Sequence, residues 1–191
     1  IQLCMWKIRK VLGEGSFGKA MLMEKNGVQV VAKEAVENNR NASNMLKHEK
    51  NVHFDIWKKL TAGKWGPQCT RYFPMPLQIP GLSDRGYHVM AHVSGEPVGA
   101  LLNGKVSSND AKNIRKQMQL AQKCLHNIGY THRDMHPNNW LYDKLTKRLV
   151  LIDFGLTATC KTGTYCYDGL RSGHLQYMKK EHEAQSSGPR H

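Results

Sequence analysis

The sequence lacks long hydrophobic runs. Its longest aliphatic stretch is the four residues Leu149–Ile152, whereas a helix that spans a membrane needs about 20 apolar residues. No basic segment followed by an apolar one opens the printed sequence, so no secretory signal is expected. The sequence therefore predicts a protein without a membrane-spanning helix.

Acidic residues are scarce relative to basic ones. The 191 residues include 28 Lys and Arg but only 15 Asp and Glu, which gives a formal net charge of +13. Such a surface attracts polyanions and acidic protein partners, although a basic surface alone does not define a function. We expect an acidic protein partner and no specific recognition of nucleic acid.

Paired cysteines are also lacking. The five cysteines are scattered and form no CxxC pair, and their odd number argues against a disulfide framework and a structural zinc site. This usage is typical of a reducing, intracellular compartment, so we expect a cytoplasmic protein. The five are Cys4, Cys69, Cys124, Cys160 and Cys166.

The chain is long enough for one sizeable domain or two small lobes. Its first 35 or so residues alternate apolar and polar positions, and the pair Asn26-Gly27 predicts a hairpin between two strands. Helical patterns follow over residues 42–60 and after the expected cap at Asn109-Asp110. Tyr87–Val93 and Leu149–Ile152 are typical of short buried strands.

The segment Gly13–Ala20, GEGSFGKA, carries three glycines between two apolar stretches. Glycines at this spacing let a backbone hairpin lie directly against phosphates. A dinucleotide-binding fold would place a helix directly after them, but no helical pattern begins here before about residue 42. The segment therefore predicts a flap over a nucleotide, and a plain β-turn is the alternative.

Lys33 and Glu49 form a candidate ion pair. Lys33 follows the apolar strand expected over residues 28–32, and Glu49 falls on the same helical face as Met45 and Val52. Burial of an unpaired carboxylate costs several kcal/mol, so Lys33 is its natural partner. A lysine held by a glutamate and aimed at phosphates is typical of phosphoryl-transfer sites. The alternative is a Glu49 that reaches solvent.

Two further motifs place acids in polar loops. They are HRDMHPNN, residues 132–139, and the segment LIDFG, residues 151–155. Asn139 and Asp153 offer oxygen atoms that suit Mg²⁺ and its phosphate ligands. Asp134 is then placed to accept a hydroxyl proton. Seven specified residues in this order, H-R-D, N and D-F-G, do not arise readily by chance.

With these motifs the chain resembles a eukaryotic-type protein kinase over roughly residues 7–155. The resemblance implies an α+β, two-lobed fold, with a small antiparallel sheet and one helix over residues 1–93. A truncated, mainly helical second lobe would span 94–180, with a hinge near Ser94–Pro97 and a flexible tail over 181–191. It also implies an ATP- and Mg²⁺-dependent kinase of proteins, serine/threonine rather than tyrosine. Its small size resembles that of bacterial-effector and viral kinases, which work inside a host cell.

The same resemblance implies a role for each motif residue. Lys33 would contact the α- and β-phosphates and be positioned by Glu49, while Asp134 would orient or deprotonate the acceptor hydroxyl. Asn139 and Asp153 would hold Mg²⁺. The residues expected to bind ATP are Gly13, Gly15, Ser16, Gly18, Ala20, Ala32, Lys33, Met90, Ala91, Val93, Leu141 and Asp153.

Departures from the family pattern leave two alternatives open. His136 stands where these kinases usually have a lysine beside the transferred phosphoryl group, and His53 stands where they usually have an apolar residue. Only 36 residues follow Gly155, too few for the usual docking helices. One alternative is a small-molecule phosphotransferase, with His136 beside the phosphoryl group. The other is a weakly active scaffold kinase switched on by a protein partner on its bare second lobe.

Overall fold

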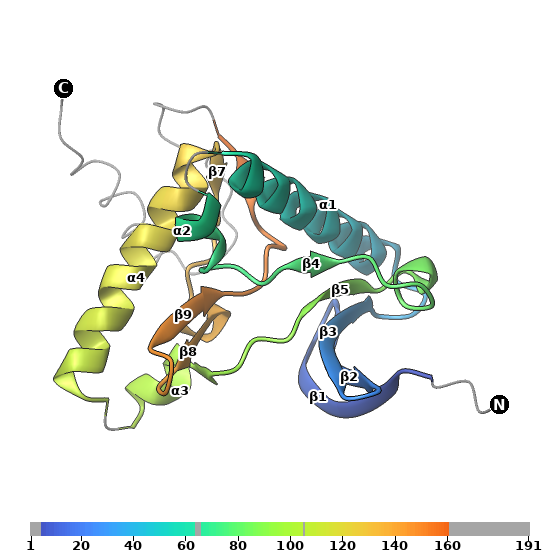
Figure 1. The fold of residues 1–191 in the computed structure, drawn as a ribbon. Helices are drawn as coiled ribbons and strands as arrows, with labels where there is room; N and C mark the ends of the chain where they lie inside the picture. The colour runs from blue at the N-terminus through green and yellow to red at the C-terminus, as the bar shows by residue number, and fades with distance from the viewer. Residues whose placement is uncertain (1–4, 64–65, 105, 161–191) are drawn as a thin grey trace.

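The computed structural model describes residues 5–63, 66–104 and 106–160. A long helix runs along the top of the view, from a group of helices and short strands on the left to a sheet on the right (Figure 1). The sheet is antiparallel and has five strands in the described part. In spatial order they are β1 (Lys7–Gly15), β2 (Gly18–Lys25), β3 (Val28–Ala35), β5 (His88–Ala91) and β4 (Pro76–Leu77).

The hairpin predicted at Asn26-Gly27 is confirmed. Asn26 and Gly27 both have positive φ, 52° and 78°, and they join β2 to β3 with Lys25 opposite Val28. Two consecutive positive φ angles match the twist of the flanking strands in a two-residue hairpin, and Asn-Gly adopts them at low cost. Strand β3 is longer than predicted and continues to Ala35, so Lys33 lies within it and not at its end.

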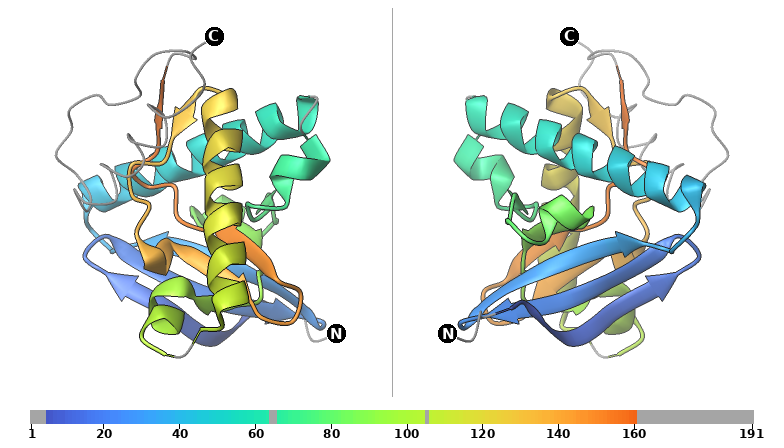
Figure 2. Two further views of the ribbon diagram at one scale, coloured as in Figure 1. Left: turned by 90° about the vertical axis from the view of Figure 1, so that its left-hand side faces the viewer. Right: turned by 90° about the vertical axis from the view of Figure 1, so that its right-hand side faces the viewer.

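Helix α1 (Arg40–Ala62) matches the prediction over residues 42–60 and is two residues longer at each end. The side chain of Asn39 caps it by accepting a hydrogen bond from the N–H of Ala42, at 3.0 Å. Figure 2 shows α1 crossing over the sheet and approaching α4 (Ser108–Asn127) at its far end. The helix therefore lies beside both parts of the molecule.

The second part consists of α4, smaller helices and two small sheets. One sheet has three strands in the order β6–β8–β9, and the other has the two strands β7 and β10; all neighbouring strands are antiparallel. The remaining elements are α2 (Gly66–Thr70), η1 (Ser83–Arg85), β6 (Glu96–Pro97), α3 (Val98–Leu102), β7 (Tyr130–Thr131), η2 (Pro137–Asn139), β8 (Trp140–Asp143), β9 (Arg148–Leu151) and β10 (Ala158–Thr159).

The cap of α4 differs from the prediction at Asn109-Asp110. Ser107 is the N-cap, and its hydroxyl accepts a hydrogen bond from the N–H of Asp110 at 3.1 Å. The carboxylate of Asp110 instead accepts hydrogen bonds from Tyr142 at 2.6 Å and Lys147 at 2.9 Å. These bonds, Tyr142 first, lower the pKa of Asp110 to about 2. The other oxygen of this carboxylate accepts a hydrogen bond from the hydroxyl of Ser107 at 2.9 Å, so Asp110 supports the cap from three residues inside it.

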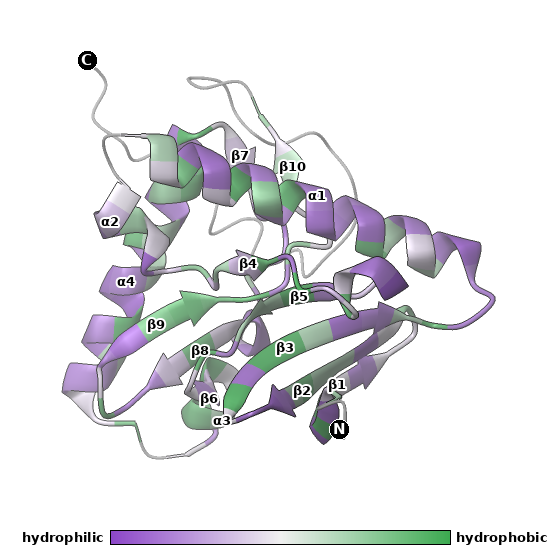
Figure 3. Cartoon of the chain, turned by 45° about the vertical axis from the view of Figure 1, so that its right-hand side comes forward, coloured by the Kyte–Doolittle hydropathy of each residue, from purple (hydrophilic) through white to green (hydrophobic). Residues whose placement is uncertain are grey.

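Two buried clusters form the interior. A small one lies within the five-stranded sheet and includes Met21, Val30 and Val89. The larger one joins α1 to the second part, because Ile56 and Leu60 of α1 pack with the same cluster as Leu125, Trp140 and Phe154. Figure 3 shows the hydrophobic stretches of β3 and β9, and above them the alternating polar and apolar surface of α1.

The prediction of no disulfide framework is wrong. Cys69 of α2 and Cys124 of α4 form a disulfide with a Cα–Cα distance of 5.7 Å. Both cysteines are buried. Because the expectation of a reducing compartment depended on unpaired cysteines, the cysteines no longer support it. Cys4 and Cys166, and the predicted lobe and tail segments beyond residue 160, lie outside the described residues. Within the described ranges, no helix combines the length and the apolar composition needed to cross a bilayer.

Removal of this disulfide should lower stability measurably. The bridge closes a loop across a sequence separation of 55 residues, and chain entropy alone then predicts a loss of about 4 kcal/mol. For a chain of this size, that loss corresponds to a fall in melting temperature of about 8–16 °C. Calorimetry of the Cys69→Ala/Cys124→Ala variant beside the oxidised wild type measures it. Equal melting temperatures would contradict the stabilising role.

Candidate active site

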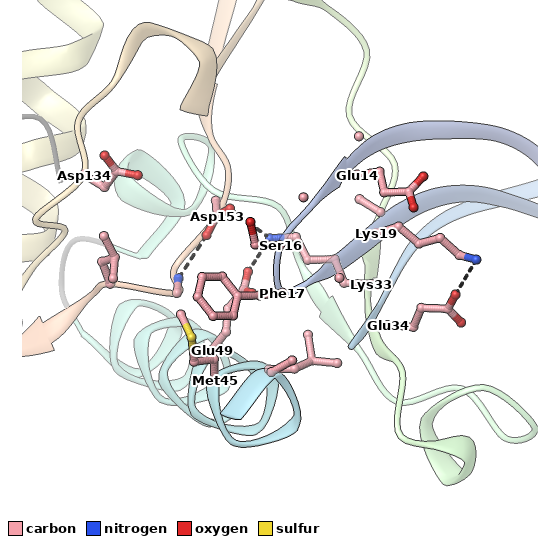
Figure 4. A pocket seen from close by; sticks show the side chains of 18 residues that line it. Glu14, Ser16, Phe17, Lys19, Lys33, Glu34, Met45, Glu49, Asp134 and Asp153 are labelled. Carbon is pink, nitrogen blue, oxygen red and sulfur yellow. Dashed lines mark hydrogen bonds and ion pairs between the residues drawn. The ribbon is translucent and has the colours of Figure 1, made fainter. Parts of the chain in front are cut away.

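A cavity of about 450 Å³ lies between the β1–β2 loop, β3, the first half of α1 and the segment after β9. Figure 4 shows Lys33 near its centre, with Glu49 and Asp153 on either side and Asp134 further along the wall. Many of the predicted site residues line it together. They are Gly13, Gly15, Ser16, Gly18, Ala20, Lys33, Glu49, Asp134 and Asp153.

Gly18 is required by the packing of the loop against β3. A Cβ atom at this position would lie 2.0 Å from the carbonyl oxygen of Glu34, closer than two non-bonded atoms can approach. Cβ atoms at Gly13 and Gly15 would meet nothing within 4 Å. Of these three glycines, only Gly18 is therefore required by the packing of the folded chain. A side chain at Gly13 or Gly15 would extend into open space.

Lys33 joins three elements through its ammonium group. Its Nζ donates a hydrogen bond to Oε1 of Glu49 on α1 and lies 3.6 Å from Oδ2 of Asp153, after β9. The side chains of Lys33 and Glu49 are only 16% and 8% exposed. The predicted ion pair is therefore present and sheltered from solvent, and the alternative of a solvated Glu49 is wrong.

Burial and charge oppose each other at this cluster. Burial lowers the pKa of Lys33, but Glu49 and Asp153 outweigh it and raise the pKa above its ordinary value. Burial also raises the pKa of Asp153, yet the ammonium of Lys33 outweighs it and holds the pKa below the usual range. At Glu49 burial dominates and raises the pKa, with Lys33 and the N–H of Phe154 acting against it. Because Lys33 faces two carboxylates, it remains an ammonium group.

Glu49 also fixes the backbone that follows Asp153. Its Oε1 accepts a hydrogen bond from the N–H of Phe154 at 3.3 Å. Asp153 has a positive φ of 73°, and its Oδ1 accepts a hydrogen bond from the N–H of Gly155 at 3.0 Å. Asp tolerates this left-handed conformation better than most residues. The carboxylate is thereby held toward the cavity.

The loop from residue 132 to 139 positions the second acid. The side-chain amide of Asn139 donates from Nδ2 to both the carbonyl oxygen and Oδ2 of Asp134, each at 2.9 Å. Oδ1 of Asp134 is buried and has no hydrogen-bond partner among the described residues. A hydrogen bond between Nε2 of His132 and the carbonyl oxygen of Asp153 joins this loop to the segment after β9. Asp134 thus presents one unused oxygen beside the cavity.

Several predicted site residues lie outside the cavity wall. Ala32 and Met90 are buried, and Ala91, Val93, Leu141 and Asn139 are partly buried, but none of them lines the cavity. His136 also lies outside the lining, and its Nδ1 accepts a hydrogen bond from the N–H of Asn138 at 3.2 Å. The adenine contacts and the role of His136 beside the phosphoryl group stay predictions.

Other residues line the cavity without having been predicted as site residues. Phe17, at the tip of the β1–β2 loop, and Met45 of α1 face the same part of the cavity in Figure 4. The sequence placed Met45 on the apolar stripe of α1, where a core position is the more common outcome. Phe17 lies between two glycines of the motif, and that position was the only signal available.

Substitution of Gly18 should destabilise the sheet. The Gly18→Ala variant must move β3 away from the loop, whereas the Gly15→Ala variant adds a methyl group in open space. We expect a clear fall in melting temperature for Gly18→Ala and little change for Gly15→Ala, measured by thermal unfolding. A similar effect of both substitutions would show that backbone freedom, and not the close approach to Glu34, sets the requirement.

The buried ion pair should differ sharply from an exposed one. Glu49→Ala leaves Lys33 buried with only the more distant Asp153, and removal of one partner from a buried pair costs about 3–5 kcal/mol. The matched control is Glu34→Ala, which breaks the more exposed pair with Lys19 and should cost less than about 1 kcal/mol. Urea unfolding gives both free energies. Equal losses would mean that the Lys33–Glu49 pair contributes no more than a surface pair.

Comparisons with known proteins agree with this geometry. A 188-residue alignment with the "Probable serine/threonine-protein kinase ndrC" of Dictyostelium discoideum has 30% identity and covers 94% of this chain and 13% of that protein. Serine/threonine-protein kinase gad8 of Schizosaccharomyces pombe is 30% identical over 84% of this chain and 28% of its own length. Serine/threonine-protein kinase PknA of Mycobacterium tuberculosis is 30% identical over 54% of this chain and 24% of its own length. The matched part of the chain thus spans between 13% and 28% of the length of these relatives.

The family model described as protein kinase domain matches residues 6–182, which is most of the chain. The match includes the glycine-rich loop, the Lys33–Glu49 pair and both loops that carry Asp134 and Asp153. With the fold and the family both established, this chain belongs to the protein kinase domain family.

Proposed function

We propose that this protein kinase uses ATP and Mg²⁺ to phosphorylate serine or threonine hydroxyl groups of proteins. The observation that carries the proposal is the grouping of Lys33, Glu49, Asp153 and Asp134 around one cavity beneath the glycine-rich loop. Such a grouping offers one fixed cation, one acid beside it and one acid with an unused oxygen. These are the parts that phosphoryl transfer requires of a protein.

Lys33 and the glycine-rich loop would hold the phosphates of ATP. The ammonium of Lys33 stays charged and is fixed by Glu49, so its position costs no reorganisation when a triphosphate binds. The open space above Gly13 and Gly15 lets phosphate oxygens approach the backbone N–H groups of the loop. Ser16 and Phe17 complete the cover over this end of the cavity.

Asn139 and Asp153 fit the requirements of a Mg²⁺ site. The amide nitrogen of Asn139 is used by Asp134, which leaves the amide oxygen as the free donor atom for a cation. Asp153 has a lowered pKa and therefore offers an ionised carboxylate. Hard oxygen ligands of this kind, together with substrate phosphates, are what Mg²⁺ prefers. When bound, the ion neutralises charge on the β- and γ-phosphates.

Asp134 would act on the acceptor. Its buried Oδ1 has no partner among the described residues, so it can accept the proton of an incoming hydroxyl group. In the transfer step the hydroxyl oxygen bonds to the γ-phosphorus, the bond from that phosphorus to the bridging oxygen of ADP breaks, and the hydroxyl proton passes to Asp134. The hydrogen bonds from Asn139 to Oδ2 and to the carbonyl oxygen hold the carboxylate in place.

The class of acceptor is inferred from two further observations. The relatives are named as serine/threonine-protein kinases, and the net charge of +13 favours an acidic protein substrate. The departure at His136, which stands where the family pattern has a lysine, favours a small-molecule acceptor instead. A protein partner that activates the enzyme, and a cytoplasmic site of action, belong to the same proposal.

The Asp134→Asn variant tests the assignment. Loss of the proton acceptor should lower phosphoryl transfer by about 100-fold or more while ATP binding is retained. The measurement is incorporation of phosphate from Mg·ATP into an acidic protein such as casein, followed by analysis of the phosphorylated amino acids. Asp84→Asn is the matched control, because Asp84 is exposed and lies outside the cavity wall.

Equal incorporation by the wild type and Asp134→Asn would overturn the proposed mechanism. Label on tyrosine alone would overturn the serine/threonine assignment. ATP consumption with choline, sugars or aminoglycosides but without protein labelling would favour the small-molecule phosphotransferase. Activity that appears only after addition of a cell lysate would favour activation by a partner.

A further inference from the structure

Two histidines are fully buried between α1 and the sheet, directly behind the cavity. His53 of α1 and His88 of β5 are both 0% exposed, and Nδ1 of His53 lies 3.0 Å from Nε2 of His88. His53 is one helical turn after Glu49, and His88 lies directly opposite Lys33 in the β3–β5 ladder. Each histidine is thus a neighbour of one residue of the ion pair: His53 is next to Glu49 on the helix, and His88 is next to Lys33 in the sheet.

The hydrogen bonds fix which nitrogen of each ring carries a proton. Nε2 of His53 lies 2.8 Å from the carbonyl oxygen of Pro74, which can only accept, so this nitrogen is protonated. In the neutral ring Nδ1 of His53 is then an acceptor, and His88 donates to it from Nε2. Nδ1 of His88 is left buried without a hydrogen-bond partner among the described residues. With both rings neutral, His53 bonds to Pro74 and to His88, whereas protonation of both rings leaves no acceptor for the bond between them.

The surroundings oppose an additional proton on either ring. Burial is the largest effect and lowers the pKa of His53 to about 4 and that of His88 to about 2. Lys33 of β3 acts in the same direction on both rings, and His53 and Lys50 of α1 do so on His88. Acting the other way, the carbonyl oxygen of Pro74 raises the pKa of His53, and Asp153 after β9 raises that of His88. Glu49, one turn before His53 on α1, is already bonded to Lys33.

The pair also contacts the segment that follows Asp153. The ring of His53 stacks on Phe154 with centroids 4.5 Å apart and 29° between the planes. The N–H of Phe154 is the group that donates to Glu49. The described hydrogen bonds and ring contacts of the two histidines reach each other, Pro74 and Phe154, and do not include Asn139 or Asp153. One hydrogen-bonded pair therefore joins α1 to the sheet and also contacts Phe154.

We propose that the His53–His88 hydrogen bond positions helix α1 so that Glu49 meets Lys33, and that acidification releases the helix and separates this ion pair. Apolar side chains could fill the same space, but they would not fix the rotation of α1 about its axis or respond to protons. His53 and His88 are positioning residues in this account, since neither lines the cavity. The functional consequence rests on the proposed phosphoryl transfer, whereas the movement of α1 does not.

The size of the effect follows from proton linkage. When α1 is released, each imidazole regains an ordinary pKa of about 6.5, whereas in the docked state both remain neutral down to about pH 5. Between pH 7.5 and pH 5.5, protonation of one exposed histidine shifts the equilibrium about tenfold toward release, and two shift it about 100-fold. Since the released state binds more protons, docking is favoured at high pH and lost as the pH falls below about 6.5.

Hydrogen exchange of the full chain measures this equilibrium directly. Protection factors of the α1 amides around His53, which already divide out the intrinsic pH dependence of exchange, should fall about 100-fold from pH 7.5 to pH 5.5. The His88→Gln variant keeps a donor for Nδ1 of His53 but loses one titrating group, so its fall should be about tenfold. His53→Gln keeps a donor for Pro74 and an acceptor for His88, and should also fall about tenfold.

The control is His48→Gln, an exposed histidine on the same helix whose ring contacts the carbonyl oxygen of Thr157. It should keep the 100-fold response of the wild type. A wild-type response below about threefold, or the same response in all four proteins, would overturn the inference. If one glutamine variant fails to fold, the other and the wild type still decide between these outcomes.

A parallel titration with a fluorescent ATP analogue at pH 7.5 separates this inference from the proposed function. Absence of nucleotide binding by wild type with normal α1 protection would count against the kinase mechanism and leave the histidine pair intact. Normal binding and transfer, together with a pH response that the glutamine variants do not reduce, would overturn the histidine pair alone. With both correct, the kcat of the wild type should fall with acidification more steeply than that of either glutamine variant.

Discussion

The contact between Lys33 and Glu49 is the interaction on which the site depends. An unpaired carboxylate or ammonium group at this depth would be strongly unfavourable, so each residue holds the other in place. The same carboxylate accepts the N–H of Phe154, and the same ammonium faces Asp153. One ion pair therefore joins the sheet, the long helix and the segment that carries the second acid.

Helix α1 can serve this contact because it belongs to two environments at once. Its residues Ile56 and Leu60 are part of the core of the second half of the molecule, while Glu49 and His53 face the sheet. Any movement that separates Glu49 from Lys33 must also disturb packing around Phe154. The geometry of the candidate site is thus supported by ordinary hydrophobic burial some distance from the cavity.

Short-range features of the fold followed from the sequence, and so did the Lys33–Glu49 pair between β3 and α1, whereas other long-range contacts did not. The Asn26-Gly27 turn and the extent of α1 depend on local conformational preferences, and both predictions are confirmed. The disulfide between Cys69 and Cys124 was missed because it requires α2 and α4 to meet, and no cysteine spacing shows that. The sequence placed the α4 cap two to three residues too late, and it did not show that Tyr142 and Lys147, more than thirty residues away, bind the carboxylate of Asp110.

The sequence by itself determined the chemical groups of the candidate site and their order: a glycine-rich loop, a lysine, a glutamate, and two acids in separate motifs. Only the tertiary structure decided which atoms meet. It directed the amide nitrogen of Asn139 to Asp134, left Oδ1 of Asp134 without a partner within residues 5–63, 66–104 and 106–160, and placed His53 against His88. The reason is physical, because residue type and spacing fix local geometry, whereas contacts between distant segments depend on how the elements pack together.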